Sequence, residues 1–268
     1  MERNHRMELQ YDGTGLHGWA KQDRLQTVEG CLEDALRTVL GRSPALRVAG
    51  RTDAGVHARR QVVSLLLPPG VDLAKLRRSL NALTPPGIAV LALRPAPATF
   101  DARTNAISRT YRYFVSTDPV VSPFWARYCW QVPAGADLQA MSAAAGLVVG
   151  RHRFTAFTPA ESEHVFFDRT VLRCRWMRPT GASAGPVPHG SGMLCLEIEA
   201  DSFLRHMVRT LVGSMIEVGQ GGRSLEDFQA LLDGAPREAA GLTAPAQGLF
   251  LWDVRYARAG VRAAGMPG

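Results

Sequence analysis

Apolar and polar residues alternate along several short stretches of the chain, which is the pattern of strands with one buried face. At residues 7–11 this period places Met7, Leu9 and Tyr11 on a single face. Similar runs predict further strands at residues 45–49, 61–67, 88–93, 109–115, 171–176, 194–199 and 249–256. The chain therefore contains more predicted strands than helices.

Helical patterns between these strands begin at residues that can cap a helix and end at glycine or proline. Predicted helices follow Thr27 as far as Gly41, Asp72 as far as Pro85, and Asp137 as far as Gly150. A longer one covers residues 203–218, and a capping box of Ser224 and Asp227 starts another. Single helices between paired strands indicate an α+β protein with antiparallel sheets, not a parallel doubly wound fold.

The elements fall into two α+β units, expected at residues 1–104 and 105–268 with a frayed C-terminal tail. Each unit should carry helices on one face of its sheet, and a cleft where they meet is a usual place for a ligand. The Pro/Gly/Ser-rich loop at 179–192 is expected to be mobile. The loop at 157–168 is acidic and is expected to gate the cleft.

Two arginines and two glutamates alternate in the strands predicted at 171–176 and 194–199. If these strands pair antiparallel, Arg173 and Arg175 face the two carboxylates. We favour this structural pairing over contact with RNA.

Composition narrows the possible partners and compartments. The net charge is +7, and only Lys21 and Lys75 of the 31 basic residues are lysines. Arginine binds phosphate through two parallel hydrogen bonds, so this balance is compatible with nucleic acid. The N-terminus lacks the apolar segment of a secretory signal and no apolar run could span a membrane, so we expect a cytoplasmic protein. Four separated cysteines argue against a zinc site or disulfides.

The run AGRTDAGVHA, residues 49–58, carries the strongest chemical candidate, Asp53. Its glycines permit a tight turn after a strand and a close approach to a ligand. Arg51 lies two residues away, and a nearby guanidinium favours the ionised carboxylate, which suits a nucleophile or a base. The alternative is a structural turn with a surface ion pair. For His57 we favour a hydrogen-bonding scaffold role.

This run resembles the central motif of the tRNA pseudouridine synthase A (TruA) family, and the other family blocks follow in order. They are YDGTGLHGW at 11–19, FDAR at 100–103, SRTYRY at 108–113, FLRHMVRTLVGSMIEVG at 203–219 and APAQGLFL at 244–251. The resemblance spans roughly residues 7–256. Two departures are Arg59-Arg60, where small residues are usual, and WAKQ at 19–22.

The resemblance implies a pseudouridine synthase fold in which ferredoxin-like halves form a central sheet and a basic cleft. It implies an isomerase, an intramolecular transferase, that converts uridine to pseudouridine at positions 38, 39 and 40 of the tRNA anticodon stem-loop. It also implies a homodimer that uses no metal and no organic cofactor. The family's catalytic aspartate, tyrosine and arginine correspond to Asp53, Tyr111 and Arg209.

Further residues are candidates for binding the substrate. A target inside a stem must be flipped out, and Arg51 is the candidate to brace the gap. Tyr111 would stack on the uracil. Other candidates for RNA contact are Lys21, Arg24, Arg59, Arg60, Arg103, Arg109, Arg112, Arg205 and Leu249. Arg205 is expected to share a helix face with Arg209, four residues later, and a solvated position at the rim is the favoured alternative.

Two other classes of function compete with an isomerase. A binding module would hold tRNA without chemistry, and Asp53 would then be structural. A hydrolase using an aspartate nucleophile would need a second carboxylate or a metal cluster, and the sequence offers no strong candidate for either.

Overall fold

The computed structural model describes residues 1–162, 165–180 and 192–257. Contacts divide the chain into two units. Unit 1 comprises residues 1–109 and the chain from residue 251 onward, and unit 2 comprises residues 110–250. The boundary therefore passes through two strands, β5 (Ala106–Ser116) and β10 (Leu249–Tyr256). The sequence did not indicate that the last strand returns to unit 1.

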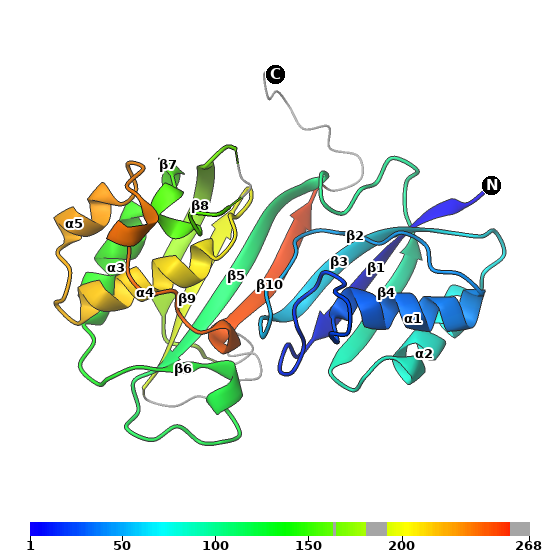
Figure 1. Cartoon of the computed structure of the whole chain (residues 1–268), viewed down its shortest axis with the longest axis horizontal. Helices are drawn as coiled ribbons and strands as arrows, with labels where there is room; N and C mark the ends of the chain where they lie inside the picture. The colour runs from blue at the N-terminus through cyan, green and yellow to red at the C-terminus, as the bar shows by residue number, and fades with distance from the viewer. Residues whose placement is uncertain (163–164, 181–191, 258–268) are drawn as a thin grey trace. The chain divides into compact units, whose positions relative to one another are not determined.

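Unit 1 contains a sheet with strand order β4-β1-β3-β10, and β2 pairs with β3. Its other strands are β1 (Arg3–Tyr11), β2 (Arg47–Val48), β3 (His57–Leu67) and β4 (Ile88–Pro95). The helices α1 (Val28–Leu40) and α2 (Leu73–Leu83) lie together on one face of this sheet (Figure 1). Both helices begin at the predicted caps, where the Thr27 and Asp72 side chains accept backbone N–H bonds.

Unit 2 has the strand order β5-β9-β8-β7, and β6 runs parallel to β5. Its other strands are β6 (Trp130–Gln131), β7 (Gly150–Arg153), β8 (Asp168–Met177) and β9 (Met193–Ala200). Its helices are α3 (Leu138–Leu147), α4 (Met207–Gly219) and α5 (Leu225–Ala230), and α3 packs on both β8 and α4 (Figure 1). Short 3₁₀ turns η1 (Ala126–Tyr128), η2 (Thr155–Phe157), η4 (Arg237–Ala239) and η5 (Ala246–Gly248) connect them.

The predicted fold class is confirmed, because both units are α+β with mainly antiparallel pairing. The predicted pairing of two arginines with two glutamates is also confirmed, since Arg173 lies opposite Glu199 and Arg175 lies opposite Glu197. Most of the 179–192 loop and part of the acidic 157–168 loop fall outside the described residues. None of the described helices has the length and apolar character needed to cross a bilayer.

One prediction about α4 is wrong. The helix was expected from residue 203, but it begins at Met207. His206 adopts a left-handed backbone conformation with φ of 62°, which cannot continue a right-handed helix. Arg205 consequently lies in the turn before α4 and does not share a helix face with Arg209.

Candidate active site

Asp53 lies in unit 1, half-buried in the turn that leads from β2 into β3. Backbone hydrogen bonds hold this turn on both sides of the carboxylate. The Val56 N–H donates to the Asp53 carbonyl at 3.1 Å, and the Trp19 N–H donates to the Thr52 carbonyl at 2.9 Å. The Gly55 N–H donates to the Leu16 carbonyl at 3.1 Å. The loop at 12–19 is therefore a partner that fixes the backbone around Asp53.

Two glycines in that loop allow this close approach. A Cβ atom on Gly13 would lie 2.3 Å from the Val56 carbonyl oxygen, and one on Gly18 would lie 2.8 Å from the Thr52 carbonyl oxygen. Gly18 also has a φ of 87°, a conformation that favours glycine. The spacing of glycines in DGTGLHGW thus reflects contact between two backbones.

A buried network of neutral polar side chains also forms hydrogen bonds with residues of this turn. The hydroxyl groups of Tyr11 and Thr52 share a hydrogen bond of 2.7 Å. The Gln61 amide donates to the Tyr11 oxygen at 3.2 Å and to the Gly50 carbonyl at 2.8 Å. Burial raises the pKa of Tyr11 to about 12, although the two side-chain hydrogen bonds oppose the shift, so the phenol stays protonated.

His57 is part of this support. Its ring is buried, and Nδ1 accepts the Gly13 N–H at 2.9 Å. This hydrogen bond is one that a scaffold residue would make, and Oδ1 of Asp12 in the same loop also lies 3.1 Å from Nδ1. His57 and the residues that follow it form the start of β3, which is longer than the sequence predicted.

Tyr111 and Arg209 lie in unit 2, on β5 and in the first turn of α4. The Tyr111 ring is 8% exposed and meets the Phe203 ring edge-on, with centroids 5.0 Å apart. Nε of Arg209 donates to the Ala244 carbonyl at 2.7 Å, and the Ala244 N–H donates to the Arg209 carbonyl at 3.1 Å. This pair of bonds ties the start of α4 to the segment at 244–248.

The same segment is held against β5. The Tyr113 hydroxyl donates to the Pro245 carbonyl at 2.7 Å. Gly248 lies so close to the Tyr113 ring that an added Cβ would be 2.6 Å from Cζ. Leu249, which follows directly, is buried at the start of β10. The parts of three blocks that belong to unit 2, residues 110–113, 203–219 and 244–250, therefore come together although they are far apart in the sequence.

Known proteins match the chain over almost its whole length. A protein called tRNA pseudouridine synthase A in Syntrophotalea carbinolica is 38% identical over 94% of this chain and 96% of its own. The proteins of the same name in Frankia casuarinae and Chlorobium chlorochromatii are 41% and 38% identical, over 94% and 95% of this chain and 88% and 100% of their own. This chain belongs to the tRNA pseudouridine synthase A family. A sequence model described as tRNA pseudouridine synthase also matches residues 144–257.

Of the three residues that the resemblance predicts to be catalytic, Asp53 belongs to unit 1, and Tyr111 and Arg209 belong to unit 2. Within each unit the structure brings together the blocks that surround them. Among the described residues, His, Cys, Asp and Glu side chains form no cluster of three that could hold a metal.

Several basic residues predicted to contact RNA form hydrogen bonds, ion pairs or ring contacts within unit 1. Arg109 donates to the carbonyls of Ala49, Ala106 and Arg103 at 2.6–3.3 Å. This side chain therefore has a structural role, because it connects β5 to the segment that precedes the turn of Asp53.

The two departures from the family pattern also have partners in unit 1. Arg60 is paired with Glu8 at 3.2 Å and Asp253 at 3.1 Å, and Arg59 lies over the Trp252 ring at 4.8 Å. Lys21 is paired with Glu33 at 2.8 Å. Lys21 and Arg59 are nevertheless exposed, like the candidates Arg24, Arg51, Arg103 and Arg205.

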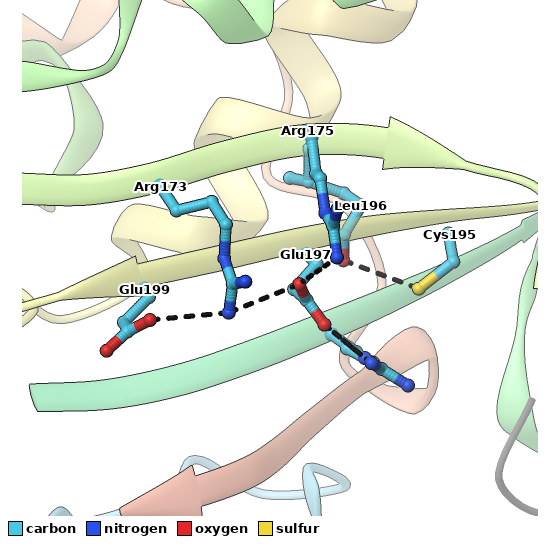
Figure 2. A network of polar contacts seen from close by, with 7 residues as sticks. Arg173, Arg175, Cys195, Leu196, Glu197 and Glu199 are labelled. Carbon is cyan, nitrogen blue, oxygen red and sulfur yellow. Dashed lines mark hydrogen bonds and ion pairs between the residues drawn. The ribbon is translucent and has the colours of Figure 1, made fainter. Parts of the chain in front are cut away.

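One buried ion pair in unit 2 was not predicted. Arg112 donates to Glu197 through Nε at 2.9 Å and through Nη2 at 2.5 Å, and the two side chains are 11% and 4% exposed. Arg175 and Arg173 reach the same carboxylate at 2.9 and 3.4 Å, and Figure 2 shows these two arginines and Glu197. Residue alternation placed Arg112 opposite Tyr111 on the strand, but no sequence signal named its partner 85 positions away.

Proposed function

We propose that this chain is an isomerase that converts uridine to pseudouridine at positions 38, 39 and 40 of the tRNA anticodon stem-loop. Membership in the tRNA pseudouridine synthase A family supports isomerisation of uridine in tRNA, and the anticodon positions are the finer part of the proposal. The observation that carries it is the half-buried carboxylate of Asp53 in a turn that is anchored to the loop at 12–19.

The reaction breaks the N1–C1′ glycosidic bond, rotates the uracil and forms a bond from C5 to C1′. The proton on C5 then leaves, and N1 gains one. An ionised carboxylate can attack C1′, add to C6 of the base, or remove a ribose proton, and all three routes require Asp53 beside the nucleoside. We assign that role to Asp53.

Tyr111 and Arg209 complete the proposed site. The family resemblance implies a catalytic role for Arg209, and we propose that its positive charge favours the ionised form of the catalytic carboxylate. Tyr111 stacks on the uracil and assists removal of the C5 proton. Its ring is already fixed at one edge by Phe203, so little side-chain freedom is lost when a base stacks on it.

Binding of the stem requires contacts outside the reacting nucleotide. A paired uridine must leave its helix before a side chain can reach it, at a cost of a few kcal/mol. Arg51, exposed two residues before Asp53, is proposed to occupy the gap. The exposed arginines Arg24, Arg103 and Arg205, with Lys21, Arg59, Arg60 and Arg109, are proposed to contact phosphate, and Leu249 to line the nucleoside site.

The assembly and location follow from the same resemblance. We propose a cytoplasmic homodimer that holds one tRNA across both subunits. Two joined basic surfaces would bind RNA more tightly, and the affinity would fall steeply with salt. Mass measurement by light scattering, with and without tRNA, tests the dimer; a monomer at micromolar concentration would contradict it.

Substitution of Asp53 by asparagine tests the catalytic assignment. This change keeps the shape of the side chain and removes its charge, so turnover should fall by on the order of 10³-fold or more while tRNA affinity stays within a few-fold. Tritium release from tRNA labelled at C5 of uridine measures turnover, and mapping of pseudouridine in the product reads the positions.

Asp23→Asn is the matched control, because Asp23 lies exposed in the preceding loop of the same unit. It should retain full activity. Conversion of uridine at 38–40 by Asp53→Asn at a normal rate would overturn the assignment and favour a structural role for this aspartate.

A further inference from the structure

The Glu197 carboxylate lies at the centre of an ion cluster on the sheet of unit 2. Its Oε2 accepts both hydrogen bonds from Arg112 on β5, and its Oε1 accepts from Arg175 on β8 at 2.9 Å. Arg173 bridges Glu197 and Glu199, at 3.4 and 3.3 Å (Figure 2). One carboxylate on β9 therefore links the strands on both of its sides.

Arg112 and Tyr111 are consecutive residues of β5, so their side chains leave the strand on opposite faces. On one face the Tyr111 ring touches Phe203, which precedes α4. On the other face the Arg112 guanidinium is fixed to Glu197, and both of these side chains are almost fully buried. The Arg112–Glu197 ion pair consequently fixes the backbone of Tyr111 from the opposite face of β5.

We propose that Glu197 and Arg112 are positioning residues for the isomerisation, acting through Tyr111. This inference rests on the proposed function. The pair fixes the position and orientation of β5 relative to β9. It thereby fixes the plane of the Tyr111 ring, on which the uracil is proposed to stack. A displacement of about 1 Å at a reacting group can cost on the order of 10²-fold in rate, so a buried clamp one residue away has a direct effect on turnover.

Glu197→Gln is the principal test. The substitution keeps the side-chain volume but leaves Arg112 without its counter-charge in a buried place. We expect kcat to fall about 10- to 100-fold, with the KM for tRNA within about twofold of the wild-type value, because the positioning affects the reacting base and not the phosphate contacts. Thermal melting curves establish that the variant is folded at the temperature of the assay.

Glu199→Gln is the matched control. Glu199 lies on the same strand and pairs with the more exposed Arg173. Its loss should leave kcat and KM within about twofold of wild type. Equal effects of the two substitutions on kcat would overturn the proposal.

Two further variants exclude a general loss of stability. Arg112→Lys keeps the charge but cannot reproduce both hydrogen bonds, so kcat should fall about 3- to 10-fold in a folded protein; an unchanged kcat would overturn the proposal even if Glu197→Gln does not fold. In a Tyr111→Phe background, Glu197→Gln should lower kcat by less than in wild type, because both act on one group. Full additivity would contradict positioning through Tyr111.

The assays also separate this inference from the function on which it rests. A wild-type protein that forms no pseudouridine would overturn the proposed function and this inference with it. An active wild type whose Glu197→Gln and Glu199→Gln variants have the same kcat would overturn the positioning role alone.

Discussion

The two units stabilise their share of the site by different physical means. In unit 1 the turn of Asp53 rests on backbone hydrogen bonds, two glycines that permit close approach, and the neutral Tyr11–Thr52–Gln61 network. In unit 2 the strand of Tyr111 rests on a buried ion pair and its neighbouring arginines.

Because of this difference, the two units should respond differently to changes in pH, salt and side-chain size. Backbone contacts and neutral hydrogen bonds depend on shape and keep their strength over a wide range of pH and salt. A buried ion pair depends on the charge of both partners, and removal of one leaves an uncompensated charge. Added atoms in the loop at 12–19 should therefore disturb the turn of Asp53, and protonation of Glu197 should weaken the contacts that hold the strand of Tyr111.

The largest effect is expected from Gly13→Ala. The new Cβ would lie 2.3 Å from the Val56 carbonyl oxygen, so either the loop at 12–19 or the turn of Asp53 must move. We expect a loss of about 3 kcal/mol in the free energy of unfolding, together with a loss of turnover. Chemical denaturation and the tritium assay measure the two quantities.

Gly15→Ala is the control for that experiment. Gly15 lies in the same loop with a φ of 75°, but a Cβ there meets no atom within 4 Å. It should cost about 1 kcal/mol through backbone strain alone, with turnover preserved. Similar losses of turnover in both variants would show that close packing against the turn is not the reason for Gly13.

An intermediate effect is expected in acid, and it should begin in unit 2. Burial disfavours the charged form of Glu197, but the hydrogen bonds and charge of Arg112, with help from Arg173 and Arg175, outweigh it and hold its pKa below the ordinary value. The stability from this cluster is therefore present above the ordinary glutamate range, near about 4.3, and is lost as the pH falls through the lower native pKa.

Hydrogen exchange at successive pH values measures this order. Peptides from β5, β8 and β9 should lose protection before peptides from β1 and β3. Glu197→Gln should weaken the dependence on pH, whereas the exposed Glu226→Gln should not. Simultaneous loss in both units would contradict the comparison.

The smallest effect is expected from Tyr11→Phe. The change removes the hydroxyl that joins Thr52 to Gln61 and should cost about 1 kcal/mol in the free energy of unfolding. Because no partner in the network is charged, the cost should be the same in 0.1 and about 1 M salt. A cost that disappears in high salt would show that electrostatics contribute to this turn after all.

Local rules explain which parts of the fold could be predicted. The side chains of Thr27, Asp72, Asp137 and Ser224 cap helices as expected, because a cap depends on residues within one turn. The start of α4 was predicted four residues before its true position at Met207. The residue types around His206 do not indicate its left-handed backbone conformation.

The site residues also differ in how far the local sequence could predict them. Asp53 stands out from its own neighbours, since glycines and an arginine surround it. Arg109 binds the Ala49 carbonyl 60 positions away and Arg112 binds Glu197 85 positions away, and no local pattern in the sequence indicated these two contacts. Asp53 was therefore a candidate on local sequence alone, whereas Tyr111 and Arg209 became candidates only through the family resemblance.

The return of β10 to unit 1 has a consequence for synthesis of the protein. Residues 251–256 pair beside β3, contribute Asp253 to Arg60 and place Trp252 against Arg59, while the Tyr256 hydroxyl donates to the Ala102 carbonyl at 2.6 Å. An emerging chain that ends at residue 109 lacks this edge. The unit that carries Asp53 can therefore reach its final structure only after residue 256 has been synthesised, and a fragment that ends at residue 109 would lack this strand.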